Sequence, residues 1–239
     1  MANAWVDQKV LKERLAVFFG QSKKEVALFG QTVNQTFEAF VFAATVAWYN
    51  DRKWTVRFIH PPKLGAVPAT PKLKFSTRGR PGNYSYAVCE KNNVERHVRH
   101  QLRVATRTHR AAQKKPANIC LDVAVIEPLN LFGFSTDDYV SNSHLVSFGE
   151  AKHMSAFAEL VANFIGLVHE LQPERLKRIR TKAFLSKVRP DPAPFLYVSG
   201  VLYRTAMGIV ETIERRKYDI DVFNKTNALS GSMNLQGAT

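Results

Sequence analysis

The chain contains few cysteines, no long apolar run and no nucleotide-binding signature. Only Cys89 and Cys120 occur among its 239 residues, with no CxxC pair and no disulfide framework. We expect two reduced thiols, as in a cytoplasmic protein. No apolar run reaches about 18 residues, and the charged, amphipathic N-terminus lacks the apolar core of a signal peptide. We therefore expect a cytoplasmic protein with no membrane-spanning helix and no membrane partner.

Acidic residues are scarce relative to basic ones. Lys and Arg number 34, Asp and Glu number 20, and the formal net charge is +14. Such a surface attracts polyanions, and nucleic acid is the commonest of these. An anionic membrane and an acidic protein are the alternatives, and charge alone does not choose among them. The chain has no P-loop, no dinucleotide-binding glycine pattern and no nucleophile elbow, so those enzyme classes are excluded.

The hydrophobic pattern predicts an α/β domain. Apolar residues make up 45% of the chain, enough for one large core. Apolar periodicity predicts helices over residues 5–18, 23–50, 154–171 and 205–217. Strands are predicted over residues 54–59, 73–76, 84–89, 119–126, 145–152, 195–202 and 219–223. We divide the chain into an N-terminal helical element (1–30), a core (31–224) and a disordered tail (225–239).

Asp122 is the first candidate for chemistry. It lies in the strand-like sequence Ile-Cys-Leu-Asp-Val-Ala-Val-Ile, whose other seven residues are apolar. A carboxylate buried in such a strand is unfavourable unless it is paired or binds a metal. The alternative is an Asp that caps a neighbouring backbone group. Asp137 and Asp138 lie in a polar loop and rank below it.

Glu150 and Lys152 form the second candidate, in Leu-Val-Ser-Phe-Gly-Glu-Ala-Lys. Residues two apart in a strand point to the same face, so an acid and an amine lie side by side. The acid offers oxygen to a hard cation. The amine is suited to orienting water and offsetting phosphate charge. A Glu-x-Lys triplet is weak evidence alone, but here it follows a buried Asp in the preceding strand.

Together, Asp122 and Glu150-Ala151-Lys152 resemble the PD-(D/E)xK signature of the restriction-endonuclease-like phosphodiesterases. The resemblance covers roughly residues 30 to 220, with Leu121 in place of the family's Pro and a long gap between the two motif halves. It implies a mixed sheet flanked by helices on both faces, in which the two catalytic strands form a hairpin and a helix follows the second strand. Many members also carry a Glu on a helix before the first core strand, and Glu38 resembles it. Alternatively, Glu38 is a partly exposed acid near a helix N-terminus.

The resemblance implies a metal-dependent endonuclease that hydrolyses DNA, of restriction or anti-phage defence type. Asp122, Glu150 and the carbonyl of Ala151 would hold Mg²⁺, for which Mn²⁺ substitutes, and Lys152 and Glu38 would assist the attacking water. A homodimer or a larger defence complex stays open. The alternatives are a ribonuclease, a nucleic-acid-binding module without catalysis, and a scaffold that docks on an acidic protein.

The basic segments supply candidate phosphate contacts. Residues 93–115 are strongly basic, and the sequence leaves open whether they form a helix or an irregular arm. On a helix, five arginines at spacings of three and four would form one stripe: Arg96, Arg99, Arg103, Arg107 and Arg110. A second patch begins at Lys177 and Arg178. The alternative for both is an ordinary solvated surface.

Overall fold

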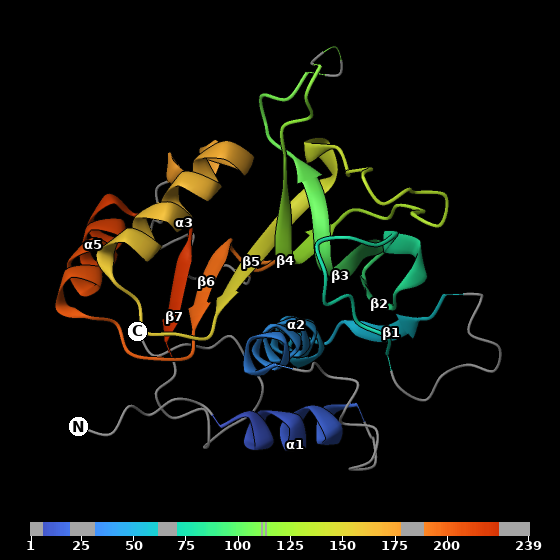
Figure 1. Cartoon of the computed structure of the whole chain (residues 1–239), viewed down its shortest axis with the longest axis horizontal. Helices are drawn as coiled ribbons and strands as arrows, with labels where there is room; N and C mark the ends of the chain where they lie inside the picture. Colours follow the sequence, from blue (N-terminus) through green and yellow to red (C-terminus); the bar gives the residue numbers. More distant parts are fainter. Residues whose placement is uncertain are drawn as a thin grey trace.

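The chain folds around a seven-stranded sheet whose strands follow one another in sequence order (Figure 1). The computed structural model describes residues 7–19, 32–61, 71–110, 112, 114–177 and 189–224. The strands are β1 (Thr55–Ile59), β2 (Tyr86–Lys91), β3 (Val94–Ala105), β4 (Asn118–Ile126), β5 (Leu145–Lys152), β6 (Phe195–Val198) and β7 (Asp221–Asn224). Neighbours are antiparallel from β1 to β5, whereas β6 and β7 run parallel to β5. The sheet is therefore mixed, as predicted.

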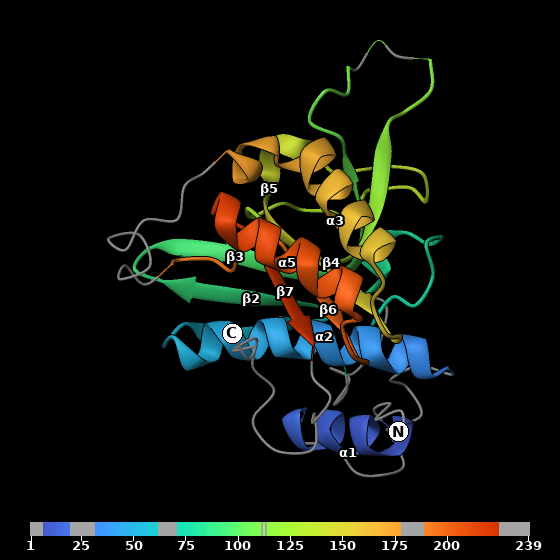
Figure 2. The same cartoon turned by 90° about the vertical axis from the view of Figure 1, so that its left-hand side faces the viewer.

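Helices cover both faces of this sheet (Figure 2). They are α1 (Gln8–Phe18), α2 (Val33–Asp51), α3 (Ala158–Leu171) and α5 (Arg204–Arg216), with short 3-10 turns at Pro81–Asn83, Asn142–His144 and Pro173–Leu176. One core cluster joins α1 and α2 to the sheet, and a second joins α3 and α5 to it. No helix in the described part of the chain is both long and apolar enough to cross a bilayer.

Helix α2 is apolar on almost every side because it lies between two layers. Phe37, Phe40 and Phe42 are buried, although they do not share one face. Leu11 and Leu15 of α1 belong to the same core cluster and are fully buried. Helix α1 thus covers the side of α2 that faces away from the sheet (Figure 2).

Strands β4 and β5 are found where the sequence predicts them. Strand β5 has the predicted bounds, and β4 begins one residue earlier than predicted. Helix α3 begins at Ala158 and not at residue 154, because the chain bends at residues 153–154 and Ala156 then forms a single bridge with Leu202. Phe157 is therefore the exposed N-cap of α3 and is not part of its buried face.

The prediction of a strand over residues 73–76 is wrong. Residues 73–76 form no strand, and β2 pairs instead with β3. The turn between them is Asn92-Asn93, whose φ angles of 51° and 62° suit the primed turns of tight hairpins. The basic segment accordingly begins as a central strand, and neither a helix nor an irregular arm describes residues 94–105.

The helix predicted over residues 23–50 corresponds to α2, which begins at Val33. The earlier part of that predicted helix lies largely outside the described residues. The tail over 225–239 lies entirely outside them.

Candidate active site

The β4–β5 hairpin brings Asp122 and Lys152 into contact. The backbone N–H of Ala151 donates to Asp122 Oδ2 at 2.9 Å, and Lys152 Nζ donates to the same oxygen at 3.1 Å. Lys152 Nζ also donates to Glu150 Oε2 at 2.9 Å. One ammonium group therefore bridges two carboxylates from neighbouring strands. Asp122 does cap a backbone group, but it also faces the predicted partners.

Close packing holds this hairpin against the next strand. A Cβ on Gly149 would lie 2.2 Å from the ring of Phe195 on β6. Only glycine leaves room for the Phe195 ring over β5 beside Glu150.

Glu38 joins the group through a side chain that the sequence did not single out. Gln101 Nε2 donates to Glu38 Oε2 at 2.8 Å and lies 3.4 Å from Asp122 Oδ1. Gln101 is buried on β3, opposite Asp122 in the strand register, and has a left-handed backbone with φ of 55°. Such a φ is unusual for a non-glycine residue and is often found at functional sites. We call Glu38, Gln101, Asp122, Glu150 and Lys152 the acidic cluster.

Burial and mutual repulsion perturb the acids of the cluster. Burial first, and then the Asp122 carboxylate, raise the pKa of Glu150 from near 4.5 to about 7. The same two causes raise the pKa of Glu38 to about 6, although the Gln101 hydrogen bond and Lys152 oppose them. Burial alone would lower the pKa of Lys152, but Glu150 and Asp122 outweigh it and raise that pKa. Lys152 is therefore a fixed positive charge at neutral pH.

A buried histidine lies beside Glu38 without pairing with it as an ion. His100 Nε2 is 3.8 Å from Glu38 Oε2, and its ring is almost fully buried. Burial lowers the pKa of His100 to about 4. The imidazole is consequently neutral at physiological pH and leaves the charge on Glu38 unbalanced.

The cluster carries more negative than positive charge. It has three carboxylates and one ammonium group, and Glu150 Oε1 is buried without a hydrogen-bond partner among the described residues. Within those residues, no group of three or more His, Cys, Asp or Glu side chains is arranged to hold a metal ion, since Lys152 and Gln101 lie between the carboxylates. The partnerless Glu150 oxygen is chemically able to accept a hydrogen bond or to ligate a cation.

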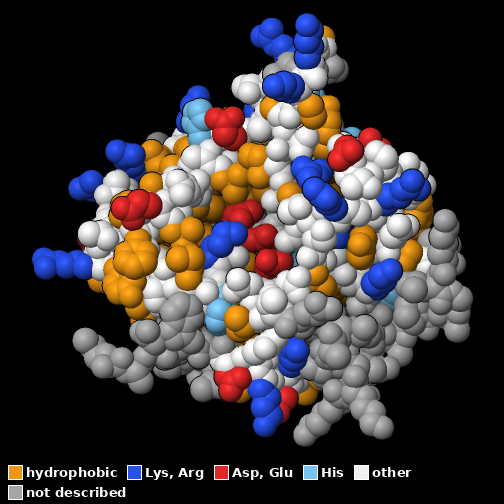
Figure 3. Space-filling model, viewed as in Figure 1, with side chains coloured by type: hydrophobic (Ala, Val, Ile, Leu, Met, Phe, Trp, Pro, Cys, Tyr) orange, Lys and Arg blue, Asp and Glu red, His pale blue; other side chains and the backbone are white. Residues whose placement is uncertain are grey.

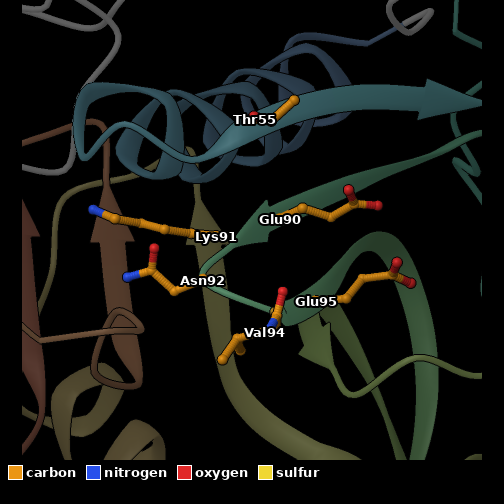
Figure 4. A pocket seen from close by; sticks show the side chains of 7 residues that line it. Thr55, Glu90, Lys91, Asn92, Val94 and Glu95 are labelled. Atoms are coloured by element: carbon orange, nitrogen blue, oxygen red, sulfur yellow. The ribbon is translucent and has the colours of Figure 1, made fainter.

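The cluster opens onto one face of the molecule. Figure 3 shows acidic side chains beside a basic one in the hollowed middle of this face, where Figure 1 places β4 and β5. About 37% of the Lys152 side chain is exposed, so a ligand can reach it. A separate surface pocket lies at the β2–β3 turn, lined by Thr55, Glu90, Lys91, Asn92, Asn93, Val94 and Glu95 (Figure 4). It contains none of the predicted site residues.

The predicted arginine stripe does not exist as one surface. Arg96 forms two hydrogen bonds with the carboxylate of Asp191, at 2.9 and 3.2 Å. Arg99 is buried with its guanidinium 3.7 Å from the centre of the Tyr86 ring, and burial lowers its pKa to about 10. These two residues have structural roles. On strand β3 their side chains pack against other residues, whereas on a helix they would have been exposed.

The other predicted phosphate contacts have different surroundings. Arg103 is half-buried and donates to Asn118 Oδ1 at 3.1 Å. Arg107 and Arg110, just beyond β3, are exposed, as is Lys177. Arg178 lies outside the described residues.

Sequence comparison with known proteins finds no relative of this chain. No protein-family model matches the chain, and no curated protein matches it in sequence. The functional assignment therefore depends on the geometry of the acidic cluster.

Proposed function

We propose that this chain is a metal-dependent phosphodiesterase, an endonuclease acting on DNA in restriction or anti-phage defence. One observation carries the proposal. Lys152 lies within hydrogen-bond distance of both Asp122 and Glu150, which come from two adjacent strands. Glu38, the fourth residue of the resemblance, reaches the same place through Gln101.

Asp122 and Glu150, with the backbone carbonyl of Ala151, are the groups that would hold Mg²⁺ or Mn²⁺. When bound, a divalent ion supplies a Lewis acid that activates water and stabilises the negative charge developing on phosphorus. The unpaired Glu150 Oε1 and the raised pKa values of Glu150 and Glu38 support a cation here, because each records negative charge that the protein alone does not balance.

Lys152 and Glu38 would act on the substrate and the water. Because its pKa is raised, Lys152 stays protonated, so it orients the nucleophile and offsets phosphate charge without removing a proton. Glu38 has a pKa of about 6, so its carboxylate is suited to accepting a proton from water near neutral pH. Gln101 holds Glu38 toward Asp122 through its amide.

A cleavage assay with the purified protein tests this function on four substrates: supercoiled plasmid, linear duplex DNA, single-stranded DNA and RNA. Each is incubated with Mg²⁺, Mn²⁺ or EDTA. We expect cleavage of DNA that EDTA abolishes. Cleavage of RNA alone would replace the substrate with RNA, and cleavage unaffected by EDTA would overturn the metal-dependent mechanism.

A second candidate is a nucleic-acid-binding module without catalysis. The observation that favours it is the Lys152 ammonium itself, which already bridges Asp122 and Glu150. Calorimetric titration with Mn²⁺ separates the two functions. Binding that Asp122→Asn abolishes favours the enzyme, whereas tight DNA binding without any metal binding favours the module.

A further inference from the structure

Two aromatic side chains are stacked and exposed where α3 and α5 begin. The ring centroids of Phe157 and Tyr203 lie 4.5 Å apart with an interplanar angle of 23°. Phe157 is 49% exposed and Tyr203 is 42% exposed. Each occupies the N-cap position of its helix, and neither side chain makes a capping hydrogen bond. Burial in the core therefore does not account for this pair.

The surrounding side chains extend the pair into an apolar surface. Met154, Val201 and Met207 are also large, hydrophobic and exposed. We call these three residues, with Phe157 and Tyr203, the aromatic platform. Figure 3 shows hydrophobic side chains gathered beside the acidic side chains on the same face. Exposed apolar side chains gathered on neighbouring segments in this way are typical of a binding site.

The platform is joined to the end of the strand that carries Lys152. Ser199 N donates to Lys152 O at 3.1 Å, and Gly200 N donates to Met154 O at 3.1 Å. A third bond, from Tyr203 N to Ala156 O at 3.0 Å, continues the pairing to the helix starts.

A glycine permits this pairing. A Cβ on Gly200 would lie 2.7 Å from the backbone N of Ser155, so only glycine allows the two segments to come this close. Phe157 follows Lys152 by five residues, which even a fully extended chain limits to about 18 Å. The platform is consequently held at a fixed place near the acidic cluster.

We propose that the aromatic platform stacks unpaired bases of single-stranded DNA whose backbone enters the acidic cluster. This inference rests on the proposed nuclease function and names its substrate class. Flat aromatic surfaces accept any unpaired base, whereas bases inside a duplex have their faces covered by their neighbours. The preferred substrate is therefore a single strand, or a duplex end or flap with unpaired bases.

Charge is compatible with this occupant. Arg204 is exposed beside Tyr203 and can contact a phosphate, and the chain as a whole carries a net charge of +14. Glu159, exposed in the first turn of α3, is the acid on the Phe157 side. A single DNA strand can therefore place its bases on the aromatic platform and its phosphates near Arg204 at the same time.

The test measures fluorescence anisotropy of a labelled single strand and of the blunt duplex of the same sequence, in EDTA. The double variant Phe157→Ala/Tyr203→Ala should bind the single strand at least about tenfold more weakly, with duplex affinity little changed. Tyr203→Phe should retain full affinity, because a phenyl ring stacks as well as a phenol. The matched control is Phe132→Ala, which removes an aromatic side chain that is 46% exposed on a different loop.

Circular dichroism and thermal unfolding check that each variant folds. If the double alanine variant does not, Phe157→Leu/Tyr203→Leu keeps the apolar area and removes only the stacking, and it should lose affinity in the same way. Unchanged single-strand affinity, or an equal loss for duplex, overturns the inference. If the double variant keeps its single-strand affinity but shifts from dimer to monomer in sedimentation, the inference is also overturned, and the platform is an interface between two copies of the chain.

Cleavage in Mg²⁺ separates this inference from the proposed function. Platform-dependent binding of single strands by a chain that cleaves no DNA would refute the nuclease and keep the platform. Cleavage of single-stranded and duplex DNA at equal rates, unchanged by the double variant, would keep the nuclease and refute the platform.

Discussion

Replacing Glu150 by Gln should stabilise the protein while removing its activity. The pKa of Glu150 is raised from near 4.5 to about 7, chiefly by burial and then by Asp122. A raised pKa means that the folded state holds a proton that the unfolded state releases. This contribution to stability is fully present below pH 4.5 and is lost as the pH rises through 7.

The magnitude follows from linkage. At about 1.4 kcal/mol per pH unit, the ionised Glu150 lowers the free energy of unfolding by about 3 kcal/mol at pH 8. Part of this is shared with Asp122, so we expect Glu150→Gln to gain about 2 kcal/mol at pH 8 and less than about 1 kcal/mol at pH 5. Glutamine keeps the shape of the side chain and removes the charge.

Urea unfolding followed by circular dichroism, in EDTA at both pH values, measures the gain. Glu159→Gln is the matched control, since Glu159 is an exposed acid on α3 and should change stability by less than about 0.5 kcal/mol. A variant no more stable than wild type at pH 8, or one stabilised equally at both pH values, would refute the electrostatic reasoning. Adding Mg²⁺ at pH 8 should stabilise the wild type more than the variant, because the cation relieves the same repulsion.

Three further outcomes are expected from other positions. Gln101→Leu should lower the free energy of unfolding by about 1–3 kcal/mol and reduce kcat, because it removes the amide between two carboxylates; denaturant unfolding and cleavage kinetics check both. Gly149→Ala should destabilise by about 1–3 kcal/mol through collision with an aromatic ring, whereas Gly166→Ala, where the added Cβ meets open space in α3, should be neutral or stabilising in the same thermal melts. Arg107→Ala should weaken DNA binding and make it less dependent on salt concentration, without changing stability, as a salt titration of DNA affinity measures. Arg99→Ala removes a buried side chain that packs on Tyr86, so its main effect should be a lower melting temperature.

Asp122, Glu150 and Lys152 could be predicted from the sequence because both of their strands are clear in the apolar pattern. Asp122 stands out as the one charge in an apolar strand, and Glu150 and Lys152 are placed on one face by the period of two. Asp122 contacts Lys152 only because β4 pairs with β5, and the structure shows this antiparallel pairing.

The hidden half of the site lies on β3. That strand was not recognised because His97, Arg99, His100 and Gln101 are polar yet buried, so hydrophobicity gives no signal there. Its hairpin turn, Asn92-Asn93, has the residue types typical of a tight turn, but the polar strand after it hid the hairpin. The role of Gln101 depends on tertiary contacts with α2 and β4, and no local pattern encodes those.

The measurement that tests the central claim most directly is the Mg²⁺-dependent nicking rate of plasmid DNA by wild type, Asp122→Ala and Lys152→Ala. Asp137→Ala is the matched control, an exposed acid in a loop outside the acidic cluster. We predict that both cluster variants lose at least about 100-fold in rate while the control keeps the wild-type rate. Nicking by a correctly folded Asp122→Ala and Lys152→Ala at the wild-type rate would show that the acidic cluster is not the active site.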